Sequence, residues 1–252
     1  MFPYRDDNPT VLTPVVTVAF ILANAAVWLL VQGLGTEPAL TRSVCSLGLI
    51  GGELLGLVPE GTRVPMGPGA ECVLGGTATW YTPLTSMFLH GGWLHLIGNM
   101  WFLWVFGNNV EDSMGHVRFV FFYLVCGLAA AAAQVAVNPE STLPMVGASG
   151  AISGIMGAYI VLYPQVRVHM LIFLGIFITT VAVPAWMMLG YWFLLQIIGG
   201  LPMLARESGG TAFWAHAGGF VAGMVLIWIF RDRSLVAARL GAPRREFRGH
   251  RW

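Results

Sequence analysis

The feature that most constrains this chain is a set of six apolar stretches that carry almost no charge. They cover residues 11–32, 93–107, 118–137, 148–163, 184–200 and 212–230. A helix rises about 1.5 Å per residue, so about 20 such residues cross the roughly 30 Å hydrocarbon layer of a membrane. Only 10% of the 252 residues are charged, whereas soluble domains average about 25%. We therefore expect an all-α membrane protein, folded as a bundle of six transmembrane helices.

The basic residues are unevenly distributed and predict the direction of the spans. All 13 are arginine, and seven of them follow Phe230. The positive-inside rule places such a tail in the cytoplasm. Residues 1–10 contain Arg5 but lack the pattern of a cleaved signal peptide, so the first stretch is expected to remain as a span. We thus expect one membrane domain over residues 1–230 and an Arg-rich cytoplasmic tail over residues 231–252.

Residues 166–200 allow either one crossing or two, because they are too long for one span and contain Pro184, which interrupts a helix. Two crossings would place the Arg-rich tail outside. One crossing keeps it inside, and residues 168–183 then lie along the inner interface or lengthen the fifth span. Six spans put both termini in the cytoplasm. The protein is expected to be embedded in the lipid bilayer.

The loop over residues 33–92 is external in this topology and is long enough to hold short interfacial helices. Cys45 and Cys72 lie in it. They could form a disulfide in an oxidising compartment, and two reduced thiols explain the sequence equally well. Cys126 lies inside the third stretch and is interpreted as a small apolar residue. The low charge argues against nucleic acid as a partner.

Strongly polar residues inside spans are costly and are therefore candidates for function. His95 and Asn99 lie one helical turn apart in the second stretch. His216 follows the external start of the sixth stretch by about 6 Å. All three are expected near the outer surface. A transporter would place its polar groups near mid-membrane instead, so it is the least favoured function.

The fourth stretch begins with Gly147-Ala148-Ser149-Gly150 and ends before Pro164. A helix of about 15 residues is roughly 22 Å long, which is too short for the bilayer. Its outer end is therefore expected below the external surface, with Ser149 at the depth of the two histidines. A serine at a helix start, with a histidine to take its proton, suits nucleophilic acyl transfer. Small residues beside a serine also occur in ordinary helix packing. However, polar residues from three spans are expected at the same depth, and this favours a functional site.

Acidic residues are expected only in loops and tails. A buried carboxylate that orients the histidine, as in a catalytic triad, is therefore not predicted. The sequence favours a Ser-His dyad.

These residues resemble the rhomboid family of intramembrane serine proteases. The matching motifs are His95-x-x-x-Asn99, Gly147-Ala148-Ser149-Gly150 and Ala215-His216-x-x-Gly219-x-x-x-Gly223. The resemblance covers residues 91–230 and implies the six-helix core of bacterial members, with a bacterial inner membrane as the expected location. It implies that Ser149 is the nucleophile and His216 the general base and acid. It also implies that His95, Asn99 and the Ser149 backbone N–H stabilise the oxyanion.

Three further features bear on this resemblance. Gly219 and Gly223 are expected to let the sixth helix pack closely against the fourth. The first external loop has no Trp-Arg dipeptide, which many members carry. Ser153 stands where some members have a Tyr that stacks on the catalytic histidine. The sequence therefore does not identify what supports the His216 ring.

The expected function is that of a serine endopeptidase that hydrolyses peptide bonds in or next to the transmembrane helices of single-pass membrane-protein substrates. Such hydrolysis needs no metal or cofactor. The alternative is a catalytically inactive rhomboid-like protein that binds client transmembrane helices. The sequence does not define the physiological substrate or the oligomeric state.

Overall fold

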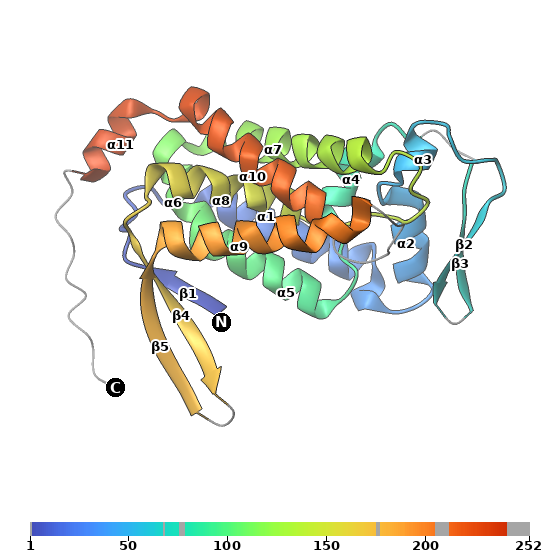
Figure 1. Ribbon diagram of the computed structural model, residues 1–252, viewed down its shortest axis with the longest axis horizontal. Coiled ribbons are helices and arrows are strands. Elements are labelled where there is room, and N and C mark those ends of the chain that lie inside the picture. The colour runs from blue at the N-terminus through green and yellow to red at the C-terminus, as the bar shows by residue number, and fades with distance from the viewer. Residues whose placement is uncertain (1, 68, 76–78, 175–176, 205–211, 241–252) are drawn as a thin grey trace.

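The computed structural model describes residues 2–67, 69–75, 79–174, 177–204 and 212–240. Its main body is a bundle of helices that run roughly along one direction (Figure 1). Five apolar helices lie where spans were expected, namely α1 (Val15–Leu30), α7 (His116–Val137), α8 (Ser149–Leu162), α9 (Ala185–Gly200) and α10 (Phe213–Phe230). Among the described residues, α7 and α10 are long and apolar enough to cross a membrane by length and composition.

The second apolar stretch forms a longer helical segment than expected. α5 (Trp93–Phe102) continues through a π-helical turn, η3 (Leu103–Gly107), into α6 (Asn108–Met114). Glu111 and Asp112 therefore lie inside helical structure, and both are buried. The expectation that acidic residues occur only in loops and tails was wrong.

The two buried carboxylates accept hydrogen bonds from the start of α1 and from the segment just before it. Glu111 accepts hydrogen bonds from the backbone N–H groups of Val16 and Thr17, at 2.9 and 2.8 Å. Asp112 accepts from the backbone N–H groups of Val11 and Leu12, at 3.0 and 2.6 Å. The first amides of a helix have no partner within the helix and form its positive end. The cost of burying Glu111 is thus offset by donors that α1 itself leaves free, and that of burying Asp112 by two amides of the preceding segment.

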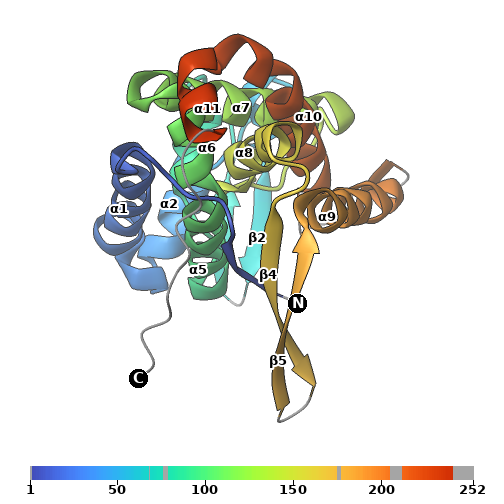
Figure 2. The same ribbon diagram turned by 90° about the vertical axis from the view of Figure 1, so that its left-hand side faces the viewer.

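α8 lies at the centre of the bundle, with other helices on several sides (Figure 2). Every residue from Gly150 to Tyr159 is buried. α10 packs directly against it. A Cβ atom at Gly219 or at Gly223 would collide with a carbonyl oxygen of α8. The predicted close approach of the fourth and sixth helices is confirmed.

The outward faces of the helices expose large apolar side chains. Leu22 of α1, Leu94 of α5, Tyr191 of α9 and Ile229 of α10 are each more than 60% exposed. Many other large apolar side chains are also exposed, and monomeric soluble proteins rarely expose large apolar surface areas to water. A hydrocarbon environment removes this cost, because lipid tails are as apolar as these side chains.

Two small sheets correct the all-α prediction. β1 (Phe2–Asp6) pairs antiparallel with β4 (Arg167–Leu174), which pairs antiparallel with β5 (Phe177–Pro184). Residues 168–183 were expected along the inner interface or as part of the fifth span. The described part of this stretch, residues 168–174 and 177–183, forms most of the β4 and β5 strands instead, and these strands extend away from the helices (Figures 1 and 2). The segment is rich in β-branched and aromatic residues, which favour strands, and Pro184 ends the strand immediately before α9.

The loop over residues 33–92 contains the short helices that were expected. They are η1 (Gly33–Gly35), α2 (Ala39–Leu47), α3 (Gly51–Leu54), α4 (Thr82–Thr85) and η2 (Ser86–Phe88). The loop also forms a hairpin, β2 (Arg63–Gly67) and β3 (Ala70–Val73). Of the two possibilities for Cys45 and Cys72, the structure has the disulfide. It ties α2 to β3.

The expected tail begins with a helix, α11 (Arg233–Leu240). Arg231 and Arg233 lie in the described residues, whereas Arg244, Arg245, Arg248 and Arg251 lie outside them. α6 and α11 lie at one end of the bundle, and α2, α3, β2 and β3 lie at the other (Figure 1).

Candidate active site

Ser149 is the first residue of α8 and is held by the segment that precedes it. Met145 pairs with Leu49 of the 33–92 loop in an isolated bridge. The Gly147 N–H donates to the Ser86 carbonyl oxygen at 2.9 Å. Irregular backbone is tolerated at membrane depth where protein covers it, and here the loop supplies that cover. The helix therefore starts at a fixed point, with the Ser149 N–H among its free first amides.

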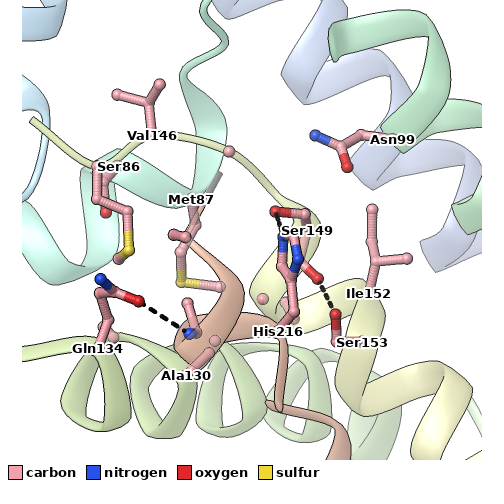
Figure 3. Close-up of a pocket in the computed structure, with 18 of the residues that line it drawn as sticks. Ser86, Met87, Asn99, Ala130, Gln134, Val146, Ser149, Ile152, Ser153 and His216 are labelled. Carbon is pink, nitrogen blue, oxygen red and sulfur yellow. Dashed lines mark hydrogen bonds between the residues drawn. The ribbon is translucent and has the colours of Figure 1, made fainter. Parts of the chain in front are cut away.

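Ser149 and His216 are in direct contact. The Ser149 hydroxyl oxygen lies 2.8 Å from His216 Nε2 (Figure 3). This is hydrogen-bond distance for a nucleophile and its base. The two residues are 67 positions apart in the sequence, and the close packing of α8 and α10 brings them together.

The side chain of His95 lies close to Gly147, as the Ser149 hydroxyl does. The Gly91 backbone N–H donates to His95 Nδ1 at 3.3 Å. A neutral imidazole that accepts at Nδ1 carries its proton on Nε2, so Nε2 is a donor here. A Cβ atom at Gly147 would lie 2.8 Å from His95 Nε2 and 3.5 Å from the Ser149 hydroxyl oxygen. Gly147, with φ at 130°, thus leaves open the space that joins the two groups.

Asn99 presents a donor to the same space. Its side chain is buried, and its amide nitrogen finds no hydrogen-bond partner among the described residues. A buried unpaired donor costs free energy and calls for an explanation. Figure 3 shows the amide end of the Asn99 side chain directed toward the pocket. A transient negative charge in the pocket would be a natural acceptor.

Ser149, His216, His95 and Asn99 all line one cavity of about 720 Å³. The structure thus brings together the four side chains that the sequence singled out, and their catalytic roles stay predictions. Ser153 also borders the cavity, but its hydroxyl donates to the Ser149 carbonyl oxygen at 2.6 Å. Among the described residues, no group of three or more His, Cys, Asp or Glu side chains could hold a metal ion.

Two residues of α9 at this site were missed by the sequence analysis. Gln196 Oε1 lies 2.8 Å from His216 Nδ1. The Trp192 ring lies 5.9 Å from the His216 ring, centroid to centroid, at an angle of 39°. Gln196 is the strongly polar residue of the apolar fifth stretch. The criterion that selected His95, Asn99 and His216 would also have selected it.

The chain matches the model of the rhomboid domain over residues 77–233. It is 38% identical over 76 residues to rhomboid-like protein 11 of Arabidopsis thaliana chloroplasts, which is 30% of this chain and 27% of that protein. It is 40% identical over 79 residues to the rhomboid protease GluP of Bacillus subtilis, which is 31% of this chain and 15% of that protein. A longer match, at 28% identity over 166 residues, is to mitochondrial rhomboid protein 1 of Saccharomyces cerevisiae, and covers 61% of this chain and 44% of that protein.

The matched regions thus span less than half of each of these three relatives. The domain match itself covers more than half of this chain and includes all four candidate site residues. The bundle, its apolar outer surface and the domain match together show that this chain is a helical membrane protein that belongs to the rhomboid family.

Proposed function

We propose that this chain is an intramembrane serine endopeptidase that uses Ser149 and His216 as a catalytic dyad. Its substrates are single-pass membrane proteins, cleaved in or next to their transmembrane helices. The observation that carries the proposal is the contact of 2.8 Å between the Ser149 hydroxyl and His216 Nε2 inside a cavity. The rhomboid family, generally one of intramembrane serine proteases, also contains inactive members, so the dyad supports the active class.

The reaction follows from the positions of the donors and acceptors. Ser149 Oγ attacks the scissile carbonyl carbon while His216 Nε2 accepts its proton. The negative oxygen that forms is stabilised by the Ser149 N–H, the Asn99 amide and the His95 Nε2–H. His216 then protonates the leaving amine, and the peptide bond breaks to leave an acyl-enzyme. Water, with His216 again as base, hydrolyses the ester and regenerates Ser149.

The substrate must present an extended carbonyl to this site. In the interior of a transmembrane helix the backbone carbonyls are hydrogen-bonded within the helix. Local unwinding is therefore required before Ser149 can attack, and glycine or other weak helix formers near the cleavage point ease it. The proposed reaction uses side chains and a backbone N–H group of this protein, together with water.

Six spans with both termini in the cytoplasm are the topology that we propose. Arg118 at the start of α7 and Arg231 after α10 lie at the end of the bundle opposite to Ser149, as does Arg167 after α8. The positive-inside rule makes that end cytoplasmic. The segment α5–η3–α6 and the five apolar helices then supply the spans. The active-site end faces the outside of a bacterial inner membrane.

The test is cleavage of a fluorescent single-pass model substrate by the purified protein in proteoliposomes. Wild-type protein should cleave it and should be labelled by a fluorophosphonate probe. Ser149→Ala should lose both activities, because no other group can form the acyl-enzyme.

A matched control is Ser46→Ala, which removes an exposed serine of α2 whose hydroxyl bonds the Arg42 carbonyl. It should cleave at the wild-type rate. Cleavage by Ser149→Ala at the wild-type rate would refute the assignment of the nucleophile. A wild-type protein that binds the substrate but is neither active nor labelled would indicate the inactive, helix-binding class.

A further inference from the structure

The second nitrogen of the His216 ring has a partner that a dyad does not require. Gln196 Oε1 lies 2.8 Å from His216 Nδ1. The Gln196 side chain comes from α9, and the residue is only 8% exposed. The contact therefore lies inside the bundle, away from competing water, where a hydrogen bond is electrostatically stronger.

The orientation of the Gln196 amide is fixed by a second hydrogen bond. Its Nε2 donates to the Trp192 carbonyl oxygen at 3.2 Å. The amide oxygen is therefore the atom that faces His216, and it can only accept. His216 must then carry its proton on Nδ1, which leaves the lone pair of Nε2 free to accept the Ser149 proton.

A second residue of α9, Trp192, lies beside the same ring. Trp192 lies one helical turn before Gln196, and its ring is in contact distance of the His216 ring. The rest of α9 is apolar, and Tyr191, Leu195 and Ile198 point outward. A glutamine in such a helix is costly unless it is bonded, and here both ends of its amide are bonded.

We propose that Gln196 is a positioning residue that fixes the tautomer and the orientation of His216, so that the working unit is Ser149, His216 and a neutral third member from α9. This proposal rests on the proposed function. A carboxylate in a triad also stabilises the imidazolium by its charge. Gln196 supplies orientation without charge. Among the described residues, no acidic side chain lines this cavity.

A simpler role for Gln196 would be to hold α9 against α10, as polar residues often do between membrane helices. The two roles differ in what a substitution changes. Loss of a packing contact lowers stability and affects substrate binding and turnover together. Loss of the acceptor for His216 lowers kcat, with KM little changed, because the ring reaches the reactive tautomer and position less often.

The experiment compares Gln196→Leu, which keeps the size and removes the acceptor, with Gln196→Glu, which keeps an acceptor oxygen at the same position. Leu195→Ala, on the outward face of α9, is the control. Gln196→Leu should lower kcat and the rate of fluorophosphonate labelling on the order of 10- to 100-fold, the range for a lost buried hydrogen bond, with KM within about twofold. Gln196→Glu should restore most of kcat, and Leu195→Ala should match wild type.

The inference is overturned if Gln196→Leu has the wild-type kcat, or if Gln196→Leu and Gln196→Glu lose kcat equally. Ser149→Ala in the same assay separates this failure from failure of the proposed function, because its loss of activity does not depend on Gln196. A measurement on the wild-type protein covers the case in which Gln196→Leu does not fold. ¹⁵N-histidine spectra, assigned by difference from His216→Gln, should show His216 protonated on Nδ1. An Nε2–H tautomer would overturn the inference.

Discussion

The two ends of the bundle bury polar groups in opposite ways. At the end near α6, Glu111 accepts two backbone N–H groups, the Thr17 hydroxyl and His116 Nδ1. At the other end, the Asn99 amide nitrogen is buried with no partner among the described residues. The Glu111 carboxylate at the first end therefore has several partners, whereas the Asn99 nitrogen at the second end is left unpaired beside the cavity.

This difference separates structural polar groups from candidate catalytic ones. A saturated carboxylate at the start of α1 stabilises the helix and can offer nothing to a ligand. An unpaired donor costs stability and gains an acceptor only when negative charge develops nearby. Burial alone does not distinguish the two cases. The hydrogen-bond partners of the group, taken together with its place beside the cavity, do.

The largest expected effect is at the end with the unpaired donor. Asn99→Ala should lower kcat/KM by about 10²- to 10³-fold, the cost of one oxyanion donor, and should leave thermal stability unchanged or slightly raised. The reason is that the lost nitrogen has no hydrogen bond to lose within the described structure. Cleavage rates and thermal unfolding of the same preparation check this. Unchanged kcat/KM would remove Asn99 from the proposed oxyanion site.

The opposite result is expected at the paired end. Glu111→Leu leaves the N–H groups of Val16 and Thr17 without their acceptor, which should lower the free energy of unfolding on the order of 3 kcal/mol. The fluorophosphonate labelling rate of the folded protein should not change, because Ser149 lies at the far end of the bundle. Glu111→Gln, which keeps one acceptor oxygen, should lose less. A fall in labelling rate with unchanged stability would contradict the comparison.

The smallest effect is expected beyond the bundle, where Asp232 precedes α11. Hydrogen bonds from the Ser234 hydroxyl and N–H, with a smaller contribution from Arg118, hold the pKa of Asp232 below its usual value of 3.8. Because the folded-state pKa is the lower one, its stabilisation is fully present above pH 3.8 and is lost as the pH falls through the folded-state pKa. Asp232→Ala should therefore speed amide hydrogen exchange in α11 at neutral pH, with no effect on cleavage.

Asp232→Asn is the control, since it keeps an acceptor oxygen without the charge. Its exchange rates should lie between those of wild type and Asp232→Ala. Identical exchange in all three proteins would show that Asp232 does not stabilise the start of α11.

Much of the fold could be predicted, because hydrophobic periodicity and the residues that start or end a helix can be recognised within a short stretch of sequence. The start of α8 at Ser149 and the start of α9 after Pro184 were both read from neighbouring residues. The β4–β5 hairpin was missed, because a short apolar run suits a strand as well as an interfacial helix. Its pairing with β1 joins residues 2–6 to residues 168–171, a contact that no local pattern specifies.

The sequence by itself determined that this protein is a membrane helix bundle and that Ser149, His216, His95 and Asn99 are candidates for its chemistry, because lipid strongly disfavours unpaired polar groups within a span. Only the tertiary structure decided their pairing. It set Ser149 against His216, placed Gln196 behind His216, and turned Glu111 toward the start of α1. A hydrogen bond depends on distances of a few tenths of an ångström, and these are set by how α8, α9 and α10 pack, which the sequence of no single helix contains.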